Sequence, residues 1–290
     1  MKKRRLLKLF IVLLVIVVVV ILSSTAFTLR NVELCFYDSN NNLIEDYEAG
    51  LKHFTEGDTQ DIIDSGEFKM GKNIFLIKKQ PSIDKIEAKF PYIKIIGISA
   101  TFPDGFKIKV RERVETYCIT LASGQVAICD SELKILDIKD SVNKFDYIAL
   151  RGLGLNDAKK GQFLTGENEI KVLKKLGSEF GANRYNNEAS IKNFESVIIE
   201  NKYMADSPQS KSPNLIIQTR VYNADDSTMA GVKIEIENIN ANFESKLNKA
   251  LSIYSKYLAD GSVKSRSGTI KIYDNLTGAY VDPTGNTSNN

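Results

Sequence analysis

The sequence contains no tryptophan, a single histidine and only three cysteines among its 290 residues. A zinc site needs three or four His, Cys or carboxylate ligands at suitable spacing, and the one histidine, His53, belongs to no such cluster. A serine or cysteine nucleophile needs a base and an orienting group, and no nucleophile-elbow motif is present. We therefore expect no metal site and no catalytic triad, and we interpret His53 as a surface residue.

Sequence signatures of nucleotide binding are also absent. The segment "RGLGLNDAKKG" contains Gly152 and Gly154, but it lacks the third glycine of a dinucleotide site and the Lys-Ser/Thr ending of a phosphate loop. The 36 acidic residues guarantee chance pairs of carboxylates, so their abundance is no evidence for glycoside chemistry. The sequence therefore predicts no catalytic residue, no cofactor and no small-molecule substrate.

Excess basic charge is confined to the start of the chain. The formal net charge is +3, and five of the 39 basic residues are Lys2, Lys3, Arg4, Arg5 and Lys8. This leaves 34 basic residues against 36 acidic ones in the rest of the chain. Nucleic-acid binding normally needs a concentrated basic face, so we expect no nucleic-acid partner.

A long apolar run follows this basic tail. From Leu9 to Leu29 there are 21 uncharged residues, and about 20 helical residues are enough to cross a bilayer. The positive-inside rule then keeps residues 1–8 in the cytoplasm and places the chain from about Arg30 onward outside the cell membrane. The sequence therefore predicts a single-pass type II membrane protein.

A cleaved signal peptide is the alternative interpretation of this run. Ser24 and Ala26 have the small-x-small spacing of a cleavage site. The apolar core from Leu6 to Leu22, interrupted only by Lys8, is however longer than the core of a usual signal peptide. This length favours a retained anchor.

The three cysteines, Cys35, Cys118 and Cys129, all follow the apolar run. If Ser123 and Gly124 form a two-residue turn in "CITLASGQVAIC", Cys118 lies opposite Cys129 and a cross-strand disulfide is possible. That register places them at a hydrogen-bonded pair of wider spacing, so free cysteines acting as small apolar residues are an equally good interpretation.

The pattern after the anchor predicts one strand followed by short helices. "FTLRNVELCFY" indicates a strand around residues 30–37. Helical spacing then predicts three helices, and the last carries Ile83, Ile86 and Phe90 on one face and ends at Pro91. The expected helices cover residues 44–54, 58–66 and 81–90.

Two strands joined by a sharp turn complete this region. The first begins at Ile93, and the "PDG" turn uses Pro103 for its fixed φ, Asp104 for local hydrogen bonds and Gly105 for a positive φ. Side chains of a strand alternate between its two faces. We expect one face to carry Ile96, Ile98, Ala100 and Phe102 on the first strand and Phe106, Ile108 and Val110 on the second.

The rest of the chain predicts a β-rich domain, so the fold class is α+β. Three short strands follow one another up to about residue 138, with turns at Gly124 and "DSEL", and "SVIIEN", "NLIIQTRVYN" and "GVKIEIEN" are further strands. A polar loop at 202–214 separates the first two of these. A helix near 243–260 carries an apolar stripe, which is more often core than interface, before a last hairpin. The stripe is formed by Phe243, Leu247, Leu251, Tyr254 and Leu258.

The order of motifs between residues 71 and 137 closely resembles the FtsQ/DivIB family of bacterial cell-division proteins. In that family a glycine and "NIF" precede a helix, a proline leads into a strand, a second proline opens the hairpin turn, and the next strand ends in "ER". A later family element has an aspartate and a glycine, but Lys134 stands here where glycine is usual. The matching residues are Gly71, Asn73 to Phe75, Pro91 with Ile93, Pro103 with Gly105 in its turn, Glu112 with Arg113, and then Ile128, Asp130, Leu133 and Leu136.

The resemblance implies a domain order. It consists of a basic cytoplasmic tail at 1–8, a transmembrane helix at 9–29, a POTRA module of β-α-α-β-β order at 30–113, a β-domain with a covering C-terminal helix at 114–281, and a disordered tail at 282–290. Residues 38–54 look inserted after the first strand of the POTRA module.

The function implied by the resemblance is a non-enzymatic scaffold of the divisome at the division septum. Such a scaffold holds FtsL-like and FtsB/DivIC-like single-pass proteins and helps to control septal peptidoglycan synthesis. In the family, the exposed last strand of the β-domain binds the FtsB-like partner. Carried over, that strand is Ala279, Tyr280 and Val281, with Tyr273 across the hairpin, and backbone pairing would supply the affinity.

Two other functions are alternatives. One is a membrane-anchored cell-wall hydrolase that uses two carboxylates, which clustered Asp and Glu in a deep cleft would favour. The other is a POTRA-bearing transport component, although the chain lacks the alternating strands of an outer-membrane pore.

Overall fold

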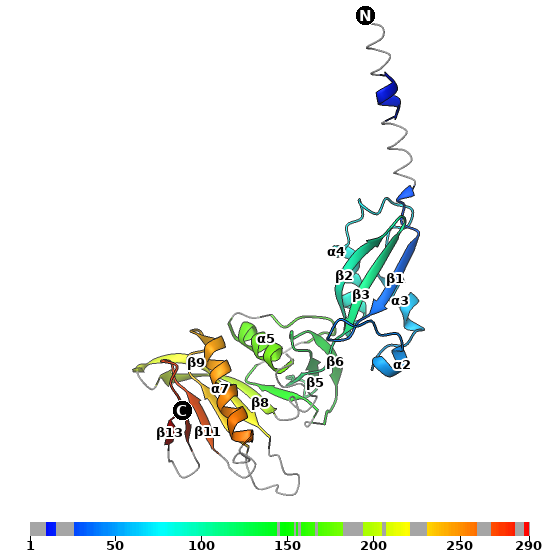
Figure 1. Cartoon of the computed structure of the whole chain (residues 1–290). Helices are drawn as coiled ribbons and strands as arrows, with labels where there is room; N and C mark the ends of the chain where they lie inside the picture. The colour runs from blue at the N-terminus through cyan, green and yellow to red at the C-terminus, as the bar shows by residue number, and fades with distance from the viewer. Residues whose placement is uncertain are drawn as a thin grey trace, which may run out of the picture. The chain divides into compact units, whose positions relative to one another are not determined.

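A computed structural model places the chain as two compact units, Met1–Arg113 and Val114–Asn290 (Figure 1). The described residues are 10–15, 26–143, 146–153, 155, 158–165, 168–181, 194–204, 207–220, 231–259, 268–281 and 287–289. No helix within these ranges is both long and apolar enough to cross a bilayer. The predicted tail at 1–8 and residues 9 and 16–25 of the predicted membrane helix lie outside the described residues. The predicted end of that helix at Leu29 is wrong, because Leu29 is buried in the core of the first unit and donates its N–H to the Lys72 carbonyl.

The first unit is a three-stranded sheet packed against short helices. Its elements are β1 (Asn31–Phe36), α2 (Tyr47–Gly50), α3 (Asp58–Ser65), α4 (Gln80–Lys89), β2 (Ile93–Thr101) and β3 (Gly105–Glu112). The strand order is β1-β3-β2, with β1 parallel and β2 antiparallel to β3. Strand, helices, strand and strand follow one another as predicted, although the helix expected at 44–54 is only four residues long.

The core of this unit follows from the period-two pattern of β3. Phe106, Ile108 and Val110 are at most 1% exposed, as predicted, while the residues between them point away from the core. Ile62 of α3 and Ile86 of α4 are completely buried in the same cluster. The two helices therefore cover the apolar face of the sheet.

The predicted face of β2 is wrong at two positions. The pairing of β2 with β3 shifts between Ile95 and Gly97, and a bulge of this kind inserts one residue and exchanges the faces of the strand. Ile95 therefore packs against the core in place of Ile96. Phe102 lies beyond the strand, in the turn, and its side chain is 64% exposed.

Gly105 also has a different role from the one predicted. It does not adopt a positive φ but begins β3, and the turn before it contains a cis Phe102–Pro103 peptide. A Cβ at Gly105 would lie 3.3 Å from the Thr101 carbonyl oxygen and 3.5 Å from that of Asn31. Glycine is needed here because two neighbouring backbones approach closely.

The second unit is a mixed sheet of ten strands in the order β13-β12-β11-β10-β9-β8-β7-β4-β5-β6. The pairs β4–β7, β7–β8 and β10–β11 are parallel, and the others are antiparallel. The strands are β4 (Tyr117–Thr120), β5 (Val126–Cys129), β6 (Ile135–Lys139), β7 (Ile148–Arg151), β8 (Phe194–Met204), β9 (Ser207–Thr219), β10 (Lys233–Ile236), β11 (Thr269–Ile272), β12 (Gly278–Val281) and β13 (Thr287–Asn289).

Two helices, α5 (Asn168–Gly181) and α7 (Phe243–Ala259), lie across this sheet (Figure 1). Leu247, Leu251 and Tyr254 of α7 are at most 4% exposed, so this part of the predicted stripe is core. The loop predicted at 202–214 is wrong, because β8 and β9 continue as paired strands through most of it. Polar composition alone suggested a loop, but pairing with the neighbouring strand satisfies the backbone of these residues.

The predicted register of the β4–β5 hairpin is wrong by one residue. Leu121 donates its N–H to the Gln125 carbonyl at 2.8 Å, so the loop has three residues and ends with Gly124 at φ +87°. Tyr117 consequently pairs with Cys129, and Cys118 pairs with Ile128.

This shift separates the two cysteines that were expected to face each other. A one-residue change of register moves a side chain to the opposite face of a sheet. Cys129 lies in the main core, and Cys118 lies in a small cluster with Ile128 and Tyr147 on the other face. All three cysteines are buried, and none forms a disulfide in the part of the chain that the structure describes.

A thiol titration checks this register. We expect three reactive thiols in the unfolded chain without reductant and the same number with reductant, because Cys118 and Cys129 do not face each other. A Cys118→Ala variant is the control and should lose one thiol under both conditions. One thiol without reductant and three with it would restore the predicted bridge.

Candidate partner-binding surface

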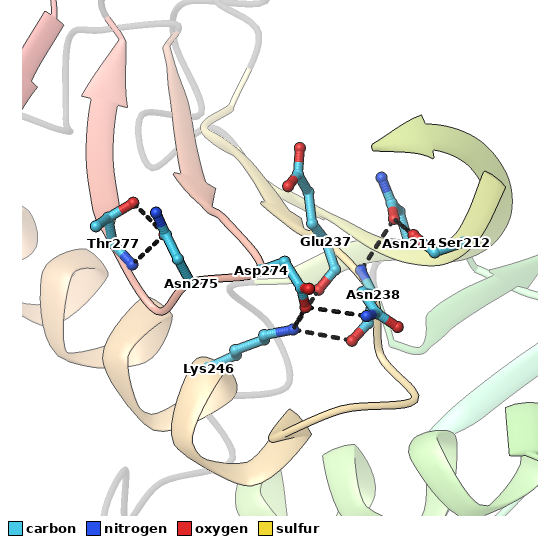
Figure 2. A network of polar contacts seen from close by, with 8 residues as sticks. All are labelled: Ser212, Asn214, Glu237, Asn238, Lys246, Asp274, Asn275 and Thr277. Atoms are coloured by element: carbon cyan, nitrogen blue, oxygen red, sulfur yellow. Dashed lines mark hydrogen bonds and ion pairs between the residues drawn. The ribbon is translucent and has the colours of Figure 1, made fainter. Parts of the chain in front are cut away.

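The C-terminal hairpin of the second unit is closed by a turn that is held by its own side chains. Tyr273 donates its N–H to the Thr277 carbonyl at 3.0 Å, and Leu276 occupies the turn at φ 64°. The Asn275 side-chain oxygen accepts hydrogen bonds from the Thr277 N–H at 3.0 Å and the Thr277 hydroxyl at 2.6 Å (Figure 2). Asparagine stabilises such a turn because its short side chain reaches the backbone two residues on.

A buried lysine ties this turn to the rest of the unit. Lys246, in the first turns of α7, has no exposed surface. Its Nζ donates to the carbonyl oxygens of Glu237 and Asn238, both at 2.9 Å, and to Asp274 Oδ1 at 2.7 Å (Figure 2). One ammonium group therefore joins the end of β10, the start of α7 and the turn that follows β11.

Two asparagines extend this network. The Asn238 side chain donates to Asp274 Oδ1 at 3.0 Å, and the Asn238 N–H donates to the Asn214 side-chain oxygen at 3.1 Å. The Ser212 hydroxyl donates to the same oxygen at 3.2 Å (Figure 2). The Lys246 ammonium holds the pKa of the Asp274 carboxyl below its ordinary value of 3.8, because the charged carboxylate accepts its hydrogen bond. Asp274 is therefore ionised at neutral pH and fixes the turn.

Gly278, the first residue of β12, lets α7 pack closely on the hairpin. A Cβ at this position would lie 3.0 Å from side-chain atoms of Ile253, Ile272 and Lys249. Only glycine fits such a close approach without displacing its neighbours. The position of β12 is thus set by both the turn and the helix.

The hydrogen-bond alternation decides which backbone groups of β12 point outward. In an antiparallel ladder, hydrogen-bonded and non-bonded pairs alternate along the strands. Because Tyr273 bonds to Thr277, the next bonded pairs are Lys271 with Ala279 and Thr269 with Val281. The N–H and C=O groups of Gly278 and Tyr280 therefore point away from β11, toward the outer edge of the sheet.

The structure corrects two expectations about this edge. β12 is not the last strand, because Thr287–Asn289 of the tail expected to be disordered forms β13 and pairs with it. Tyr273 does not lie across from Ala279–Val281 but opposite Thr277, at the turn. The predicted partner residues are brought together on one strand, Tyr273 lies at the turn of the same hairpin, and β13 covers the outer side of that strand.

The motif residues of the first unit have structural roles. Gly71 adopts φ 75°, and Asn73 forms a bridge with Thr28 and accepts the Phe75 N–H through its side chain at 3.0 Å. Pro91 follows α4, and Pro103 follows the cis peptide of the hairpin turn.

The "ER" pair at the end of β3 fixes the neighbouring segments. Glu112 accepts the backbone N–H groups of Lys52 and His53 at 2.8 and 2.7 Å and lies 2.7 Å from the His53 ring Nδ1. The Arg113 side chain is only 3% exposed, and its Nη2 lies 3.0 Å from Glu87 Oε2. His53 thus has a structural contact that its sequence context did not indicate.

The turn with the atypical Lys134 is built by an aspartate. The Asp130 carboxylate accepts the N–H groups of Glu132 at 3.0 Å and Lys134 at 2.8 Å, and Leu133 takes the positive φ of 63°. The family glycine is therefore not needed at position 134, since the left-handed residue is the one before it.

An acidic groove beside β1 is the candidate active site for the alternative function, a hydrolase that uses two carboxylates. It encloses about 820 Å³. The Cys35 thiol, which donates to Glu33 at 3.1 Å, and the Lys107 ammonium hold the pKa of the Glu33 carboxyl below its ordinary value. A general acid needs a raised pKa, so Glu33 is unsuited to that role. The carboxylates lining the groove are Glu33, Glu45, Asp46, Glu48 and Glu56.

Metal binding finds no support in the part of the chain that the structure describes, which contains no group of three or more His, Cys, Asp or Glu residues suited to hold an ion. The groove beside β1 therefore presents carboxylates to solvent without a metal-ligating geometry. We therefore interpret the groove as an acidic, solvent-exposed surface and not as a hydrolytic active site.

Comparison with known families identifies the first unit. Residues 52–113 match the family model described as the FtsQ-type POTRA domain. A search of curated proteins returned no match to the chain. The family match confirms the resemblance to FtsQ/DivIB proteins for the POTRA domain and indicates a scaffold role related to cell division, with protein–protein interaction as its activity. The match ends at Arg113, the last residue of the first unit, and does not extend into the second unit.

Proposed function

We propose that this chain, which carries an FtsQ-type POTRA domain, is a non-enzymatic scaffold of the bacterial divisome. The part of the apolar run that begins at Leu9 and ends before Phe27 anchors it in the cell membrane, with residues 1–8 in the cytoplasm and the two folded units outside. There it binds FtsL-like and FtsB/DivIC-like single-pass proteins and helps to control septal peptidoglycan synthesis. The apolar run and the basic tail of the sequence support this topology.

The observation that carries this proposal is the outer edge of β12. Among the described residues, β13, a strand of three residues, is the one that pairs with this outer edge. An exposed or weakly covered strand edge accepts an additional strand from a partner, whose side chains then decide specificity. The Lys246 network and the close packing at Gly278 hold this edge in place before a partner arrives.

Displacing β13 by a partner strand costs little free energy. The net contribution of one backbone hydrogen bond is about 0.5–1.5 kcal/mol, so a three-residue ladder contributes only a few kcal/mol. A partner strand that pairs along all of Gly278–Val281 forms a longer ladder than β13, which pairs with Ala279–Val281. We therefore place the FtsB/DivIC-like partner on β12, with β13 displaced.

Imaging in dividing cells tests the proposed location. A fluorescent protein fused to the cytoplasmic end of the full chain should concentrate at the division septum. The matched control carries only residues 1–29 after the fluorescent protein, and it should be distributed evenly around the membrane. Equal distribution of both fusions would count against a role in division, and a fusion recovered in the soluble fraction would count against the anchor.

A further inference from the structure

Three exposed apolar side chains lie with a fourth at one end of the POTRA sheet, the end at which β1 begins. Phe75, Leu76 and Phe102 are 63%, 82% and 64% exposed. The rings of Phe27, Phe75 and Phe102 form a triangle with centroid distances of 5.5, 5.9 and 6.1 Å. We call Phe27, Phe75, Leu76 and Phe102 the aromatic tip.

The backbone holds the aromatic tip in a fixed arrangement. Ile74 donates its N–H to the Phe27 carbonyl at 2.8 Å, and Thr28 and Asn73 form an antiparallel bridge. Arg30 donates to the Asp104 carbonyl at 2.8 Å, which fixes the turn that carries Phe102. Three segments that are distant in sequence are therefore tied together at this end of the domain.

The apolar residues of the loop that carries Phe75 differ sharply in exposure. Ile74 is 3% exposed and belongs to the core, whereas the next two residues point into solvent. Contiguous exposed apolar side chains on a soluble domain mark an interaction site, because water solvates them unfavourably. The aromatic tip is therefore a candidate docking surface rather than an incompletely packed core.

The position of the aromatic tip in the chain indicates what covers it. Phe27 is both a member of the aromatic tip and part of the apolar run Leu9–Leu29. If the part of that run before Phe27 spans the membrane, as proposed above, the aromatic tip cannot lie more than a few residues from the bilayer surface. Aromatic side chains are enriched at this interface, where their rings lie at the level of the lipid headgroups.

Charge around the aromatic tip also favours a lipid surface. Between Phe68 and Gln80 there are four lysines and no acidic residue. Lys69, Lys72 and Lys78 have exposed side chains. Basic residues next to apolar ones are typical of segments that lie in the interface of a membrane with anionic lipids.

We propose that the aromatic tip inserts into the interface of the membrane in which the chain is anchored. Phe75, Leu76 and Phe102 enter the headgroup region, and the neighbouring lysines contact anionic lipid phosphates. The POTRA domain is then held against the bilayer at a second point in addition to its anchor. This inference rests on the proposed membrane anchor but not on the proposed division partners.

The absence of tryptophan makes a direct test possible, because a single introduced indole is the only one in the chain. The full-length Phe75→Trp variant is reconstituted in vesicles of phosphatidylcholine and phosphatidylglycerol, with and without brominated acyl chains. We expect blue-shifted emission, strong quenching by the brominated lipids and little quenching by aqueous iodide. A full-length Phe102→Trp variant is a second reporter and should behave in the same way.

The matched control is Leu43→Trp, because Leu43 is an exposed apolar residue of the same domain, 47% exposed, that bridges Tyr37 beyond the other end of β1. Its indole should be quenched by iodide and not by brominated lipid. If neither reporter differs from this control, or if both are shielded from iodide without lipid quenching, the lipid contact is refuted.

Flotation of the same vesicles in alkaline carbonate separates failure of the aromatic tip from failure of the anchor. Protein that floats without lipid quenching retains the anchor and refutes only the membrane contact of the aromatic tip. Protein that does not float refutes both.

Discussion

A Tyr280→Pro variant of the full chain is expected to bind its FtsB/DivIC-like partner at least about tenfold more weakly, which corresponds to about 1.4 kcal/mol. Tyr280 directs its N–H to the outer edge of β12, so proline removes a donor on the side where the partner strand adds. The bonded pairs with β11 involve Ala279 and Val281, which keep their N–H groups. Titration of the reconstituted chain with the soluble coiled-coil segment of the partner measures the change.

Two controls separate backbone pairing from other effects of this substitution. Tyr280→Ala removes the same side chain but keeps the N–H, so the difference between the two variants isolates the backbone donor. A chain that ends at Val281 lacks β13 and should bind at least as tightly as the full chain, because no internal strand competes. Unchanged affinity of Tyr280→Pro would refute pairing at this edge, and loss of binding on truncation would place the partner on the tail instead.

Replacing Lys246 with methionine is expected to lower the free energy of unfolding of the second unit by about 2–4 kcal/mol. Lys246 is fully buried, and its ammonium satisfies two carbonyl oxygens and the Asp274 carboxylate. Methionine fills a similar volume but donates no hydrogen bond, so the two carbonyl oxygens lose the Lys246 donor, while Asp274 keeps the donor from the Asn238 side chain. The hairpin that carries β12 should also loosen, and faster hydrogen exchange in residues 269–281 would report it.

Lys249→Met is the matched control, one turn further along α7. Among the described residues its ammonium donates to the Leu276 carbonyl at 3.0 Å, in an exposed contact, so the loss should stay at about 0.5 kcal/mol. Urea titrations of both variants provide the comparison. Equal losses would show that the buried network contributes nothing beyond an ordinary surface contact.

The loss in free energy of unfolding caused by Lys246→Met should depend on pH, and this dependence identifies the share that comes from the Asp274 ion pair. Because the folded-state pKa of Asp274 is depressed, its contribution is present above the ordinary value of 3.8 and is lost as pH falls below that value. The difference between the native chain and Lys246→Met should therefore shrink on acidification below about pH 4. The share of the destabilisation that comes from the two carbonyl acceptors, Glu237 and Asn238, should remain at low pH, because these groups do not titrate.

Short-range patterns explain why much of the POTRA domain was predictable. Period-two alternation assigned the buried face of β3, and helical spacing with flanking prolines located α4. These signals depend on neighbours only a few residues apart, so a single sequence contains them in full. The family model then matched the same region.

The errors share a different physical origin. A bulge at Ile96 and a three-residue loop at Ala122–Gly124 each changed which side chains face the core, and both are decided by strand pairing. The β8–β9 extension and β13 are likewise products of pairing between segments whose composition suggested loop or tail. The Lys246 network was missed because its acceptors come from three separate segments.

The sequence by itself determined the chemistry of this protein: a basic tail, an apolar run, an α+β chain with the order of an FtsQ-type POTRA domain, and no motif for catalysis. The tertiary structure alone decided which backbone edge is available, which strand covers it and which side chains form the exposed aromatic tip. The reason is that register and edge exposure depend on hydrogen bonds between distant segments, and these bonds leave no trace in local composition or periodicity.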